Sequence, residues 1–145
     1  MKVRDIMTQP VIHISPGESA EVAARTLTHY NIGALPVCGN DGKLCGFVTD
    51  RDLVIRCMAL GKTPGQTLVR EVMTGQVTSV QPDMEAGVAA HLMGRQQIRR
   101  LPVVENGKLC GMVSLGDLAK REASIMDAAD ALTDITSNVS SRDGW

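Results

Sequence analysis

The strongest constraint in this sequence is that it contains two copies of one segment. Displaced by 66 residues, positions 3–37 match positions 69–103 at 14 of 35 residues. Displaced by 65 residues, positions 42–56 match positions 107–121 at 9 of 15. Agreement at this level in one register indicates a tandem duplication. We therefore expect repeat 1 over residues 1–61, a linker over 62–68, repeat 2 over 69–121, and a C-terminal helix and tail over 122–145.

Each repeat predicts the element order β-α-β-β-α, which is a mixed α/β (α+β) fold. The helix over residues 19–30 follows from Ala20, Ala23, Ala24 and Leu27, which share one helical face. The other elements expected in repeat 1 are a short helix over 3–7, strands over 11–14, 34–38 and 44–49, and a helix from about Asp50 to Leu60 that Gly61 ends. In repeat 2 the turn is one residue shorter, and Asn106-Gly107 is typical of a type I′ hairpin.

The segment after Arg121 leaves the repeat. Its apolar residues predict a helix over 122–135, and residues 137–145 have the composition of a solvated tail. Cys45 and Cys110 occupy equivalent strand positions, which favours a role as small core residues. Met7 and Met73 are also equivalent in the two repeats, and we expect them in the core too. A disulfide between Cys38 and Cys45 across the hairpin is the geometrically demanding alternative.

The composition argues against several classes of partner. There are 15 Lys and Arg against 16 Asp and Glu, a net charge of −1, which disfavours charge-driven binding of nucleic acid or anionic membrane. Tyr30, Phe47 and Trp145 are the only aromatic residues, too few to stack the bases of a single strand. We find no secretory segment and no apolar run of about 18 residues. We therefore expect a cytoplasmic chain with reduced thiols.

A short motif follows the last strand of each repeat. It consists of a glycine, two apolar residues, a hydroxyl, two further residues and an aspartate, which gives Thr49 with Asp52 and Ser114 with Asp117. The hydroxyl is a good helix N-cap, and the aspartate favours the first helical turn. A helix N-terminus also suits a phosphate, and a carboxylate can accept hydrogen bonds from a ribose diol. The structural and the nucleotide interpretations are compatible.

The runs GALPV at 33–37 and GFVTDRDL at 46–53, with IRRLPVV at 98–104 and GMVSLGDL at 111–118, resemble the CBS domain. Two in tandem resemble a Bateman module of the bacterial stand-alone type that includes the hypoxic-response proteins. The resemblance covers residues 1 to about 121. It implies two repeats packed sheet to sheet about a pseudo-twofold axis. It also implies two clefts that bind adenosine-containing regulatory ligands such as AMP, ATP, NAD or S-adenosyl-methionine, with no required cofactor.

Carried over by position, the resemblance implies that Asp52 and Asp117 hold ribose hydroxyls and that Thr49 and Ser114 face phosphate. The base pocket would be lined by Ala34, Leu35 and Pro36, by Arg100, Leu101 and Pro102, and by strand residues Ile12 to Ile14 and Thr78 to Val80. A proline at such a strand start leaves an unpaired edge, where we expect a purine base to meet backbone groups.

The two sites are not expected to be equal. Arg99 and Arg100 precede the Leu-Pro-Val strand in repeat 2, where repeat 1 has Gly33 and Ala34. Arginine forms forked hydrogen bonds with phosphate oxygens, so the arginine-bearing site should favour nucleotides over adenosine. Arg51 can reach phosphate from repeat 1 and reduce this difference.

Three interpretations of function follow. The first is a regulatory, ligand-sensing module that acts on an unidentified effector protein. The second is a dimeric interaction module without a nucleotide. The third is an enzyme, which the sequence disfavours because no nucleophile triad or phosphate-binding loop stands out; His13, His29 and His91 also lack zinc-site spacing. The segment over 52–60 is apolar on most faces, which predicts a twofold homodimer with helices at the contact.

Overall fold

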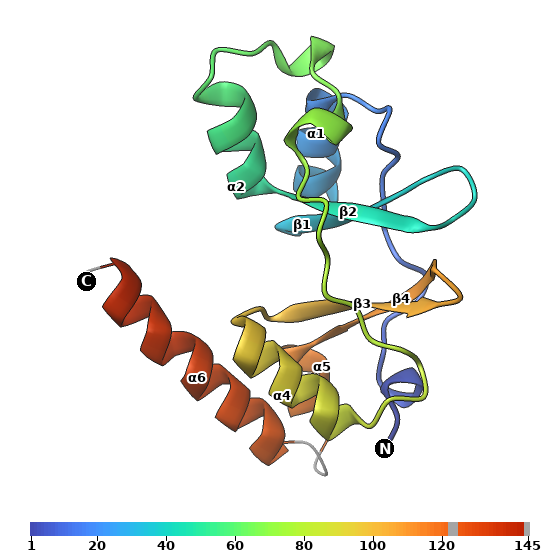
Figure 1. Cartoon of the computed structure of the whole chain (residues 1–145), viewed down its shortest axis with the longest axis vertical. Coiled ribbons are helices and arrows are strands. Elements are labelled where there is room, and N and C mark those ends of the chain that lie inside the picture. Colours follow the sequence, from blue (N-terminus) through green and yellow to red (C-terminus); the bar gives the residue numbers. More distant parts are fainter. Residues whose placement is uncertain (122–124, 144–145) are drawn as a thin grey trace. The chain divides into compact units, whose positions relative to one another are not determined.

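Each of the two sheets is a single antiparallel hairpin with helices on one face (Figure 1). The computed structural model describes residues 1–121 and 125–143, the last six as backbone only. Their contacts divide them into two compact units. The β1–β2 unit comprises Ile12–Val77 and Gly107–Leu109, and the β3–β4 unit comprises Met1–Val11, Thr78–Asn106 and Cys110–Trp145.

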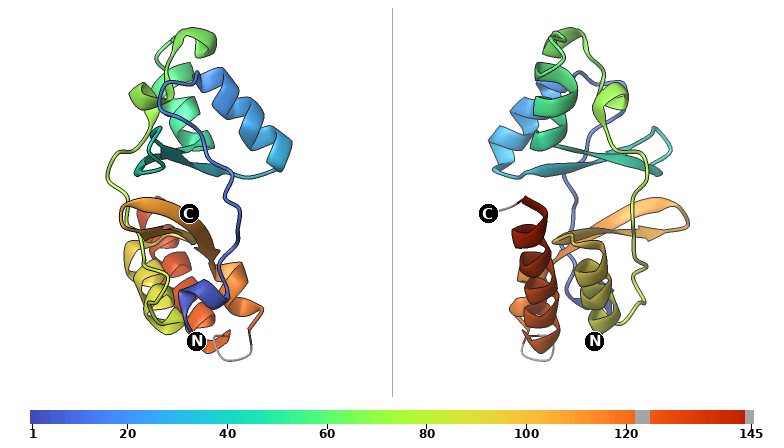
Figure 2. Two further views of the ribbon diagram at one scale, coloured as in Figure 1. Left: turned by 90° about the vertical axis from the view of Figure 1, so that its right-hand side faces the viewer. Right: turned by 60° about the vertical axis from the view of Figure 1, so that its left-hand side comes forward.

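In the β1–β2 unit, β1 (Ala34–Cys38) pairs with β2 (Leu44–Thr49), and α1 (Ala20–Tyr30) lies on the same side of the hairpin as α2 (Asp50–Leu53) (Figure 2). The α2 helix continues as the π-helical η2 (Val54–Met58). The remaining helices of the unit are η3 (Pro64–Gln66) and α3 (Val69–Val72). The Ser19 side chain caps α1 by accepting a hydrogen bond from the Val22 N–H at 3.1 Å.

The β3–β4 unit has the same plan with one addition. It contains η1 (Val3–Asp5), α4 (Ala86–Gln96), β3 (Arg100–Glu105), β4 (Lys108–Ser114) and α5 (Leu115–Ala119). Helix α6 (Ile125–Asp143) is the addition, and it packs on α4 and α5. Asn106 and Gly107 both have positive φ, at 54° and 81°, which confirms the tight turn predicted between β3 and β4.

The repeats exchange their N-terminal segments between the units. The N-terminal segment of repeat 1 joins the β3–β4 unit, where the Thr8 N–H donates to the Met112 carbonyl at 2.7 Å and the Met112 N–H donates back at 3.1 Å. The N-terminal segment of repeat 2 joins the β1–β2 unit, where Phe47 and Thr74 exchange the equivalent bonds at 2.9 and 2.8 Å. Each unit is therefore completed by residues that are far apart in the sequence. The alignment of the two repeats does not reveal this exchange.

Each unit has its own hydrophobic core. Leu35, Val37, Val48, Val69 and Val72 are fully buried in the β1–β2 unit. The fully buried residues of the β3–β4 unit are Val3, Ala89, Ala90, Met93, Leu101, Val103, Val113 and Leu118. The predicted α+β repeat fold is confirmed. Among the described residues, no helix has the length and apolar character needed to cross a membrane.

Three predicted elements differ from the structure. The strand over 11–14 is reduced to one parallel bridge, Ile14 to Val37, and its counterpart is Val80 to Val103, because prolines turn the chain two residues later in both repeats. The short helix over 3–7 is a 3₁₀ turn that ends at Asp5. The helix from Asp50 changes to π-helical hydrogen bonding at Val54, with the Ala59 N–H donating to the Val54 carbonyl at 2.8 Å.

The predicted tail is also wrong over most of its length, because α6 continues to Asp143. The predictions for residues 122–124 and 144–145 lie outside the described part of the chain. The core assignment of Cys45 is wrong as well, since Cys45 is exposed, whereas Cys110 is half-buried and packs against the core of the β3–β4 unit. Alternation along each strand turns Gly46 and Val48, or Gly111 and Val113, to the core, and Cys45 to the other face. Met7 and Met73 are half-buried against the two cores.

Candidate functional site

The hydroxyl and aspartate of each motif bond to one another's backbone at the start of a helix. Thr49 Oγ1 accepts from the Asp52 N–H at 3.0 Å, and the Thr49 N–H donates to Asp52 Oδ2 at 3.0 Å. Ser114 and Asp117 make the same pair of bonds at 3.1 and 2.8 Å. The predicted N-caps are confirmed, and each is a reciprocal capping box that uses Asp where Glu or Gln is usual.

This geometry leaves part of each group available to a ligand. The capping bond uses Oδ2 of Asp52, so Oδ1 keeps its lone pairs, and the Thr49 hydroxyl accepts through oxygen, so its proton is left to donate. The Asp52 side chain is 12% exposed, and the Arg56 guanidinium lies 3.9 Å from its Oδ1. Arg56 also donates to the carbonyl oxygens of Val72 and Met73 at 3.2 and 2.9 Å, which ties α3 to this helix.

The residues before each Leu-Pro-Val strand lie beside the capping box of the same unit. Ala34 is directly opposite Thr49 in the β1–β2 ladder, and the Asp50 N–H donates to the Gly33 carbonyl at 3.1 Å. In the β3–β4 unit the Leu115 N–H donates to the Arg99 carbonyl at 3.0 Å. The structure therefore brings the Arg99-Arg100 pair next to Ser114, and both arginines are exposed, as is Arg51 in the other unit.

The expected unpaired edge at Pro36 and Pro102 is occupied in the structure. The Ile14 N–H donates to the Pro36 carbonyl at 3.0 Å, and the Val80 N–H donates to the Pro102 carbonyl at 3.0 Å. The expectation of an unpaired edge was wrong, because the short segments before α1 and α4 pair with these strands. Proline is suited to this edge, since it presents a carbonyl acceptor and has no N–H to leave unsatisfied.

The other residues assigned to the base pocket differ in their exposure. The side chains of Leu35 and Leu101 are fully buried and Val80 is 1% exposed, so these three residues belong to the cores. Pro36 and Pro102 are buried, whereas Ala34, Ile12 and Thr78 are half-buried. A ligand at this position would therefore meet the backbone of the buried residues and the side chains of the half-buried ones.

The four cysteines are free thiols in the structure. Burial raises the pKa of the Cys38 thiol to about 11, with smaller contributions from Cys45 and Asp41. The Cys45 thiol donates to the Val37 carbonyl at 3.2 Å and the Cys110 thiol to the Val103 carbonyl at 3.3 Å. Within the described residues, no group of three or more His, Cys, Asp or Glu side chains could hold a metal ion.

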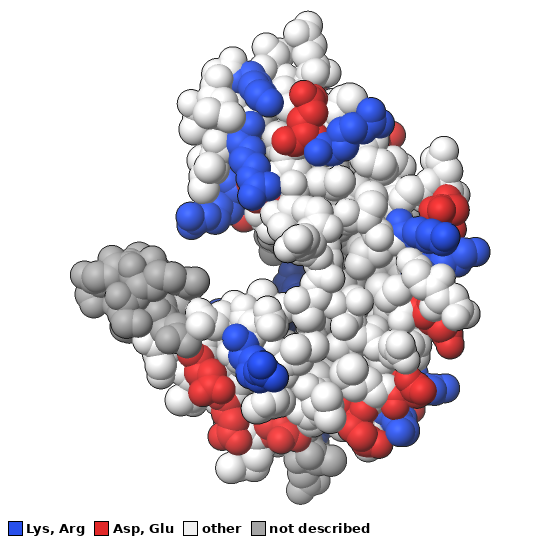
Figure 3. Space-filling view, in the orientation of Figure 1, with Lys and Arg blue, Asp and Glu red and all other residues white. Residues whose placement is uncertain are grey.

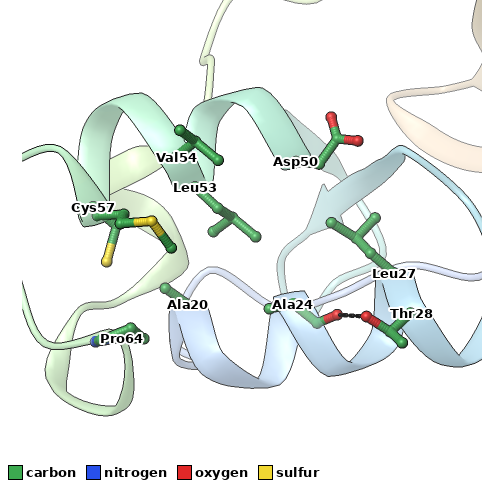
Figure 4. A pocket seen from close by; sticks show the side chains of 10 residues that line it. Ala20, Ala24, Leu27, Thr28, Asp50, Leu53, Val54, Cys57 and Pro64 are labelled. Carbon is green, nitrogen blue, oxygen red and sulfur yellow. Dashed lines mark hydrogen bonds between the residues drawn. The ribbon is translucent and has the colours of Figure 1, made fainter.

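A second feature, which the sequence analysis did not identify, is an apolar hollow of about 270 Å³ between α1 and the α2–η2 segment (Figure 4). We call it the α1–η2 groove. Ala24 and Thr28 form part of one wall, and the Thr28 hydroxyl donates to the Ala24 carbonyl at 2.9 Å, which leaves its methyl group to face out. Its lining residues are Ala20, Ala24, Leu27, Thr28, Asp50, Leu53, Val54, Cys57, Met58 and Pro64. The apolar face of α1 and the largely apolar segment over 52–60 were the sequence signal for it.

Comparison with known proteins agrees with this architecture. The family model described as "CBS domain" matches residues 3–58 and 69–124, which together are most of the chain. The chain belongs to the CBS domain family. The CBS domain-containing protein YhcV of Bacillus subtilis is 43% identical over 134 residues, covering 92% of this chain and 94% of that protein. The resemblance stated from the sequence is therefore confirmed.

Two solved CBS structures are similar over nearly their whole length. The crystal structure of Hypoxic Response Protein I with two coordinated zinc ions has a TM-score of 0.77 and 33% identity, covering 83% of this chain and 98% of that one. The crystal structure of CBSX2 in complex with AMP has a TM-score of 0.76 and 30% identity, covering 86% of this chain and 98% of that one. The second CBS match ends at residue 124, so α6 lies beyond the residues that the family model matches.

Proposed function

We propose that this CBS pair is a regulatory module that binds an adenosine-containing ligand and passes the bound state to an effector protein. The observation that carries the proposal is the repetition of one capping box, Thr49 with Asp52 and Ser114 with Asp117, beside the strand start in both units. CBSX2, a relative with the same fold, has been solved with AMP. AMP, ATP, NAD and S-adenosyl-methionine all contain the adenosine that these groups would recognise.

In this proposal Oδ1 of Asp52 and of Asp117 accepts hydrogen bonds from the two ribose hydroxyls, while Oδ2 keeps the helix start in place. Hydrogen bonds to a charged group contribute about 1.5–3 kcal/mol each, so a carboxylate is a strong ribose ligand. The hydroxyl protons of Thr49 and Ser114 donate toward phosphate. Ile12, Thr78 and Ala34, which are half-buried, form the side-chain part of the base site.

The two sites would differ in how well they hold phosphate. Arg99 and Arg100 stand beside the Ser114 box, and Gly33 and Ala34 occupy the equivalent place in the other unit. Guanidinium groups bind phosphate through two parallel hydrogen bonds, which backbone groups of Gly and Ala cannot reproduce. We assign the β3–β4 site to phosphorylated ligands and the β1–β2 site, helped only by Arg51, to a weaker phosphate preference.

The proposal includes a twofold homodimer in the cytoplasm and no catalysis. An alternative role as a dimeric interaction module without nucleotide is favoured by one observation, the apolar α1–η2 groove. The experiment that separates the two releases small molecules from the purified protein by denaturation and records their ultraviolet spectrum. An adenine band near 260 nm in the released fraction, or saturable binding of added AMP by calorimetry, supports ligand sensing. An empty fraction together with no calorimetric binding of AMP, ATP or S-adenosyl-methionine leaves only the interaction module.

A further inference from the structure

An arginine recurs four residues after the aspartate of each motif. Arg56 follows Asp52, and Arg121 follows Asp117, at equivalent positions of the two repeats. The backbone around the two arginines differs, because Arg56 lies within the π-helical η2 and Arg121 lies just beyond the end of α5. Their contacts are nevertheless alike.

Both side chains bond to the end of a short helix that belongs to the other repeat. Arg56 Nη1 donates to the carbonyl oxygens of Val72 and Met73 at 3.2 and 2.9 Å, and Val72 is the last residue of α3. Arg121 Nη2 donates to the carbonyl oxygen of Asp5 at 3.1 Å, and Asp5 is the last residue of η1. The last carbonyl groups of a helix have no partner within the helix, so each arginine supplies one from outside.

In the β1–β2 unit the same guanidinium also faces the motif aspartate. Arg56 Nη1 lies 3.9 Å from Oδ1 of Asp52, the carboxylate oxygen that the capping bond to Thr49 does not use. This distance is too long for a hydrogen bond, so it leaves the lone pairs of Oδ1 to a ligand. It is short enough for the positive charge to attract and orient the carboxylate. Because the Asp52 side chain is only 12% exposed, water and salt screen this attraction less than at an open surface.

The segment that Arg56 holds is also bound to the strand before the motif. Thr74 exchanges two backbone hydrogen bonds with Phe47, and its hydroxyl oxygen lies 3.5 Å from Arg56 Nη1. Phe47 precedes the Thr49 capping box by two residues, whereas Arg56 follows the box. Residues 72–74, which belong to repeat 2, therefore contact the chain on both sides of the capping box of repeat 1.

The bonds to the carbonyl groups fix the position of one positive charge on an otherwise open surface. Arg51 and Arg56 are both exposed on the α2–η2 segment, where blue side chains gather (Figure 3). The Arg56 side chain is anchored by its two carbonyl bonds although it is 46% exposed. An anchored charge can orient a neighbouring carboxylate without the loss of side-chain entropy that weakens most surface ion pairs.

We propose that Arg56 is a positioning residue of the β1–β2 ligand site. It orients Oδ1 of Asp52 toward the ribose hydroxyls and connects this aspartate to residues 72–74. A ligand that engages Asp52 therefore stabilises the contact between the α2–η2 segment and the N-terminal segment of repeat 2. By linkage, loosening that segment weakens ligand binding to the same extent. This inference rests on the proposed function and names a residue through which the bound state leaves the site.

The test uses two chains with one ribose ligand each. Asp117→Ala leaves the β1–β2 site to bind AMP, and Asp52→Ala leaves the β3–β4 site. Adding Arg56→Met removes the charge and the donors but keeps a long side chain. In the Asp117→Ala background we expect the AMP dissociation constant, measured by calorimetry, to rise about fivefold, the upper range for a partly exposed ion pair. In the Asp52→Ala background we expect no change. Arg56→Lys, which keeps the charge, should restore most of the affinity.

Arg25→Met is the matched control, because Arg25 forms an exposed ion pair with Glu21 at 2.8 Å on α1 of the same unit. It should leave AMP affinity unchanged in both backgrounds. Full affinity of Arg56→Met in the Asp117→Ala background, or an equal loss in both backgrounds, overturns the inference while the ribose assignment stands. If neither Asp52→Ala nor Asp117→Ala weakens AMP binding by the wild type, or if the wild type binds no AMP, the proposed function fails and this inference fails with it.

Hydrogen exchange measured by mass spectrometry tests the connection itself. With AMP at saturating concentration, the amides of residues 69–77 should exchange more slowly in the Asp117→Ala chain than without AMP. The same ligand should give no such protection once Arg56→Met is added, and saturation removes the difference in affinity from this comparison. Equal protection in the two chains would show that the ligand acts on this segment without Arg56 and would overturn the inference.

Discussion

The Sδ atom of Met7 lies 2.6 Å from the position that a Cβ atom would take at Gly111. In the other unit, the Sδ atom of its repeat counterpart Met73 lies 2.9 Å from the Cβ position at Gly46. Each methionine arrives on the N-terminal segment of the other repeat. At Gly46 the backbone oxygen of Thr74 is closer still, at 2.6 Å. The absence of a side chain at these two glycines is therefore what allows the exchanged segments to pack against the strands.

Replacing Gly46 with Ala should lower the free energy of unfolding by about 1–3 kcal/mol, the usual cost of overpacking a core. Gly111→Ala should cost less, because the atoms it meets belong to the flexible Met7 side chain and not to backbone. Urea unfolding followed by circular dichroism gives both values. Gly75→Ala is the matched control, since nothing lies within 4 Å of a Cβ atom there, and equal losses in all three variants would contradict the packing argument.

The two roles assigned to Asp117 can be separated by comparing Asp117→Asn with Asp117→Ala. Asparagine keeps an oxygen that can accept from the Ser114 N–H, so the helix start should survive, whereas alanine should lower stability by about 1 kcal/mol. Both variants lose the carboxylate, so AMP affinity at this site should fall by about 1.5–3 kcal/mol in each. Thermal unfolding and calorimetry are the measurements. Full AMP affinity in the stable asparagine variant would remove Asp117 from the ligand site.

Arg100→Ala should reduce the preference of the chain for AMP over adenosine by about 1–3 kcal/mol, because a guanidinium reads phosphate and not the nucleoside. Adenosine binding should be nearly unchanged. Parallel titrations of AMP and adenosine into the wild type and the variant measure the difference. If Arg100→Ala weakens the binding of adenosine as much as that of AMP, the arginine shapes the pocket and does not recognise phosphate.

Stability should fall in alkaline solution partly because of Cys38. Burial raises the pKa of its thiol from 9.0 to about 11, so the folded state favours the neutral form. The stability that this thiol contributes is fully present below the pKa of the unfolded state. It is lost as the pH rises through the pKa of the folded state, here between about 9 and 11. Urea midpoints across this range should drop more steeply in the wild type than in Cys38→Ala. Parallel slopes would show that the thiol does not contribute.

The sequence predicted those features that repeat periodicity or local cap chemistry determines. The hairpin strands at Ala34–Cys38 and Leu44–Thr49, the caps at Thr49 and Ser114 and the Asn106-Gly107 turn depend on neighbouring residues, and all agree with the structure. The reciprocal bond from the Thr49 N–H to Asp52 could also have been predicted, from its Thr-x-x-Asp spacing.

Long-range packing accounts for what the sequence did not reveal. The exchange that brings Met73 to Gly46 pairs residues of different repeats. The alignment of one repeat on the other does not indicate this contact. The outward position of Cys45 depends on which face of β2 the helices cover. The extension of α6 to Asp143 places Ser and Thr residues in a helix, where tertiary packing on α4 and α5 outweighs their weak propensity.

The most direct test of the sensing function is a calorimetric titration of AMP into the wild type and into the double variant Asp52→Ala, Asp117→Ala. The exposed aspartates Asp41 and Asp83 supply the matched control, Asp41→Ala, Asp83→Ala. We predict saturable binding in the wild type and the control, and a loss of affinity of roughly tenfold or more in the double variant, whose ribose ligands are gone. Equal AMP affinity in all three proteins would contradict the assignment of the two capping-box aspartates as ribose ligands.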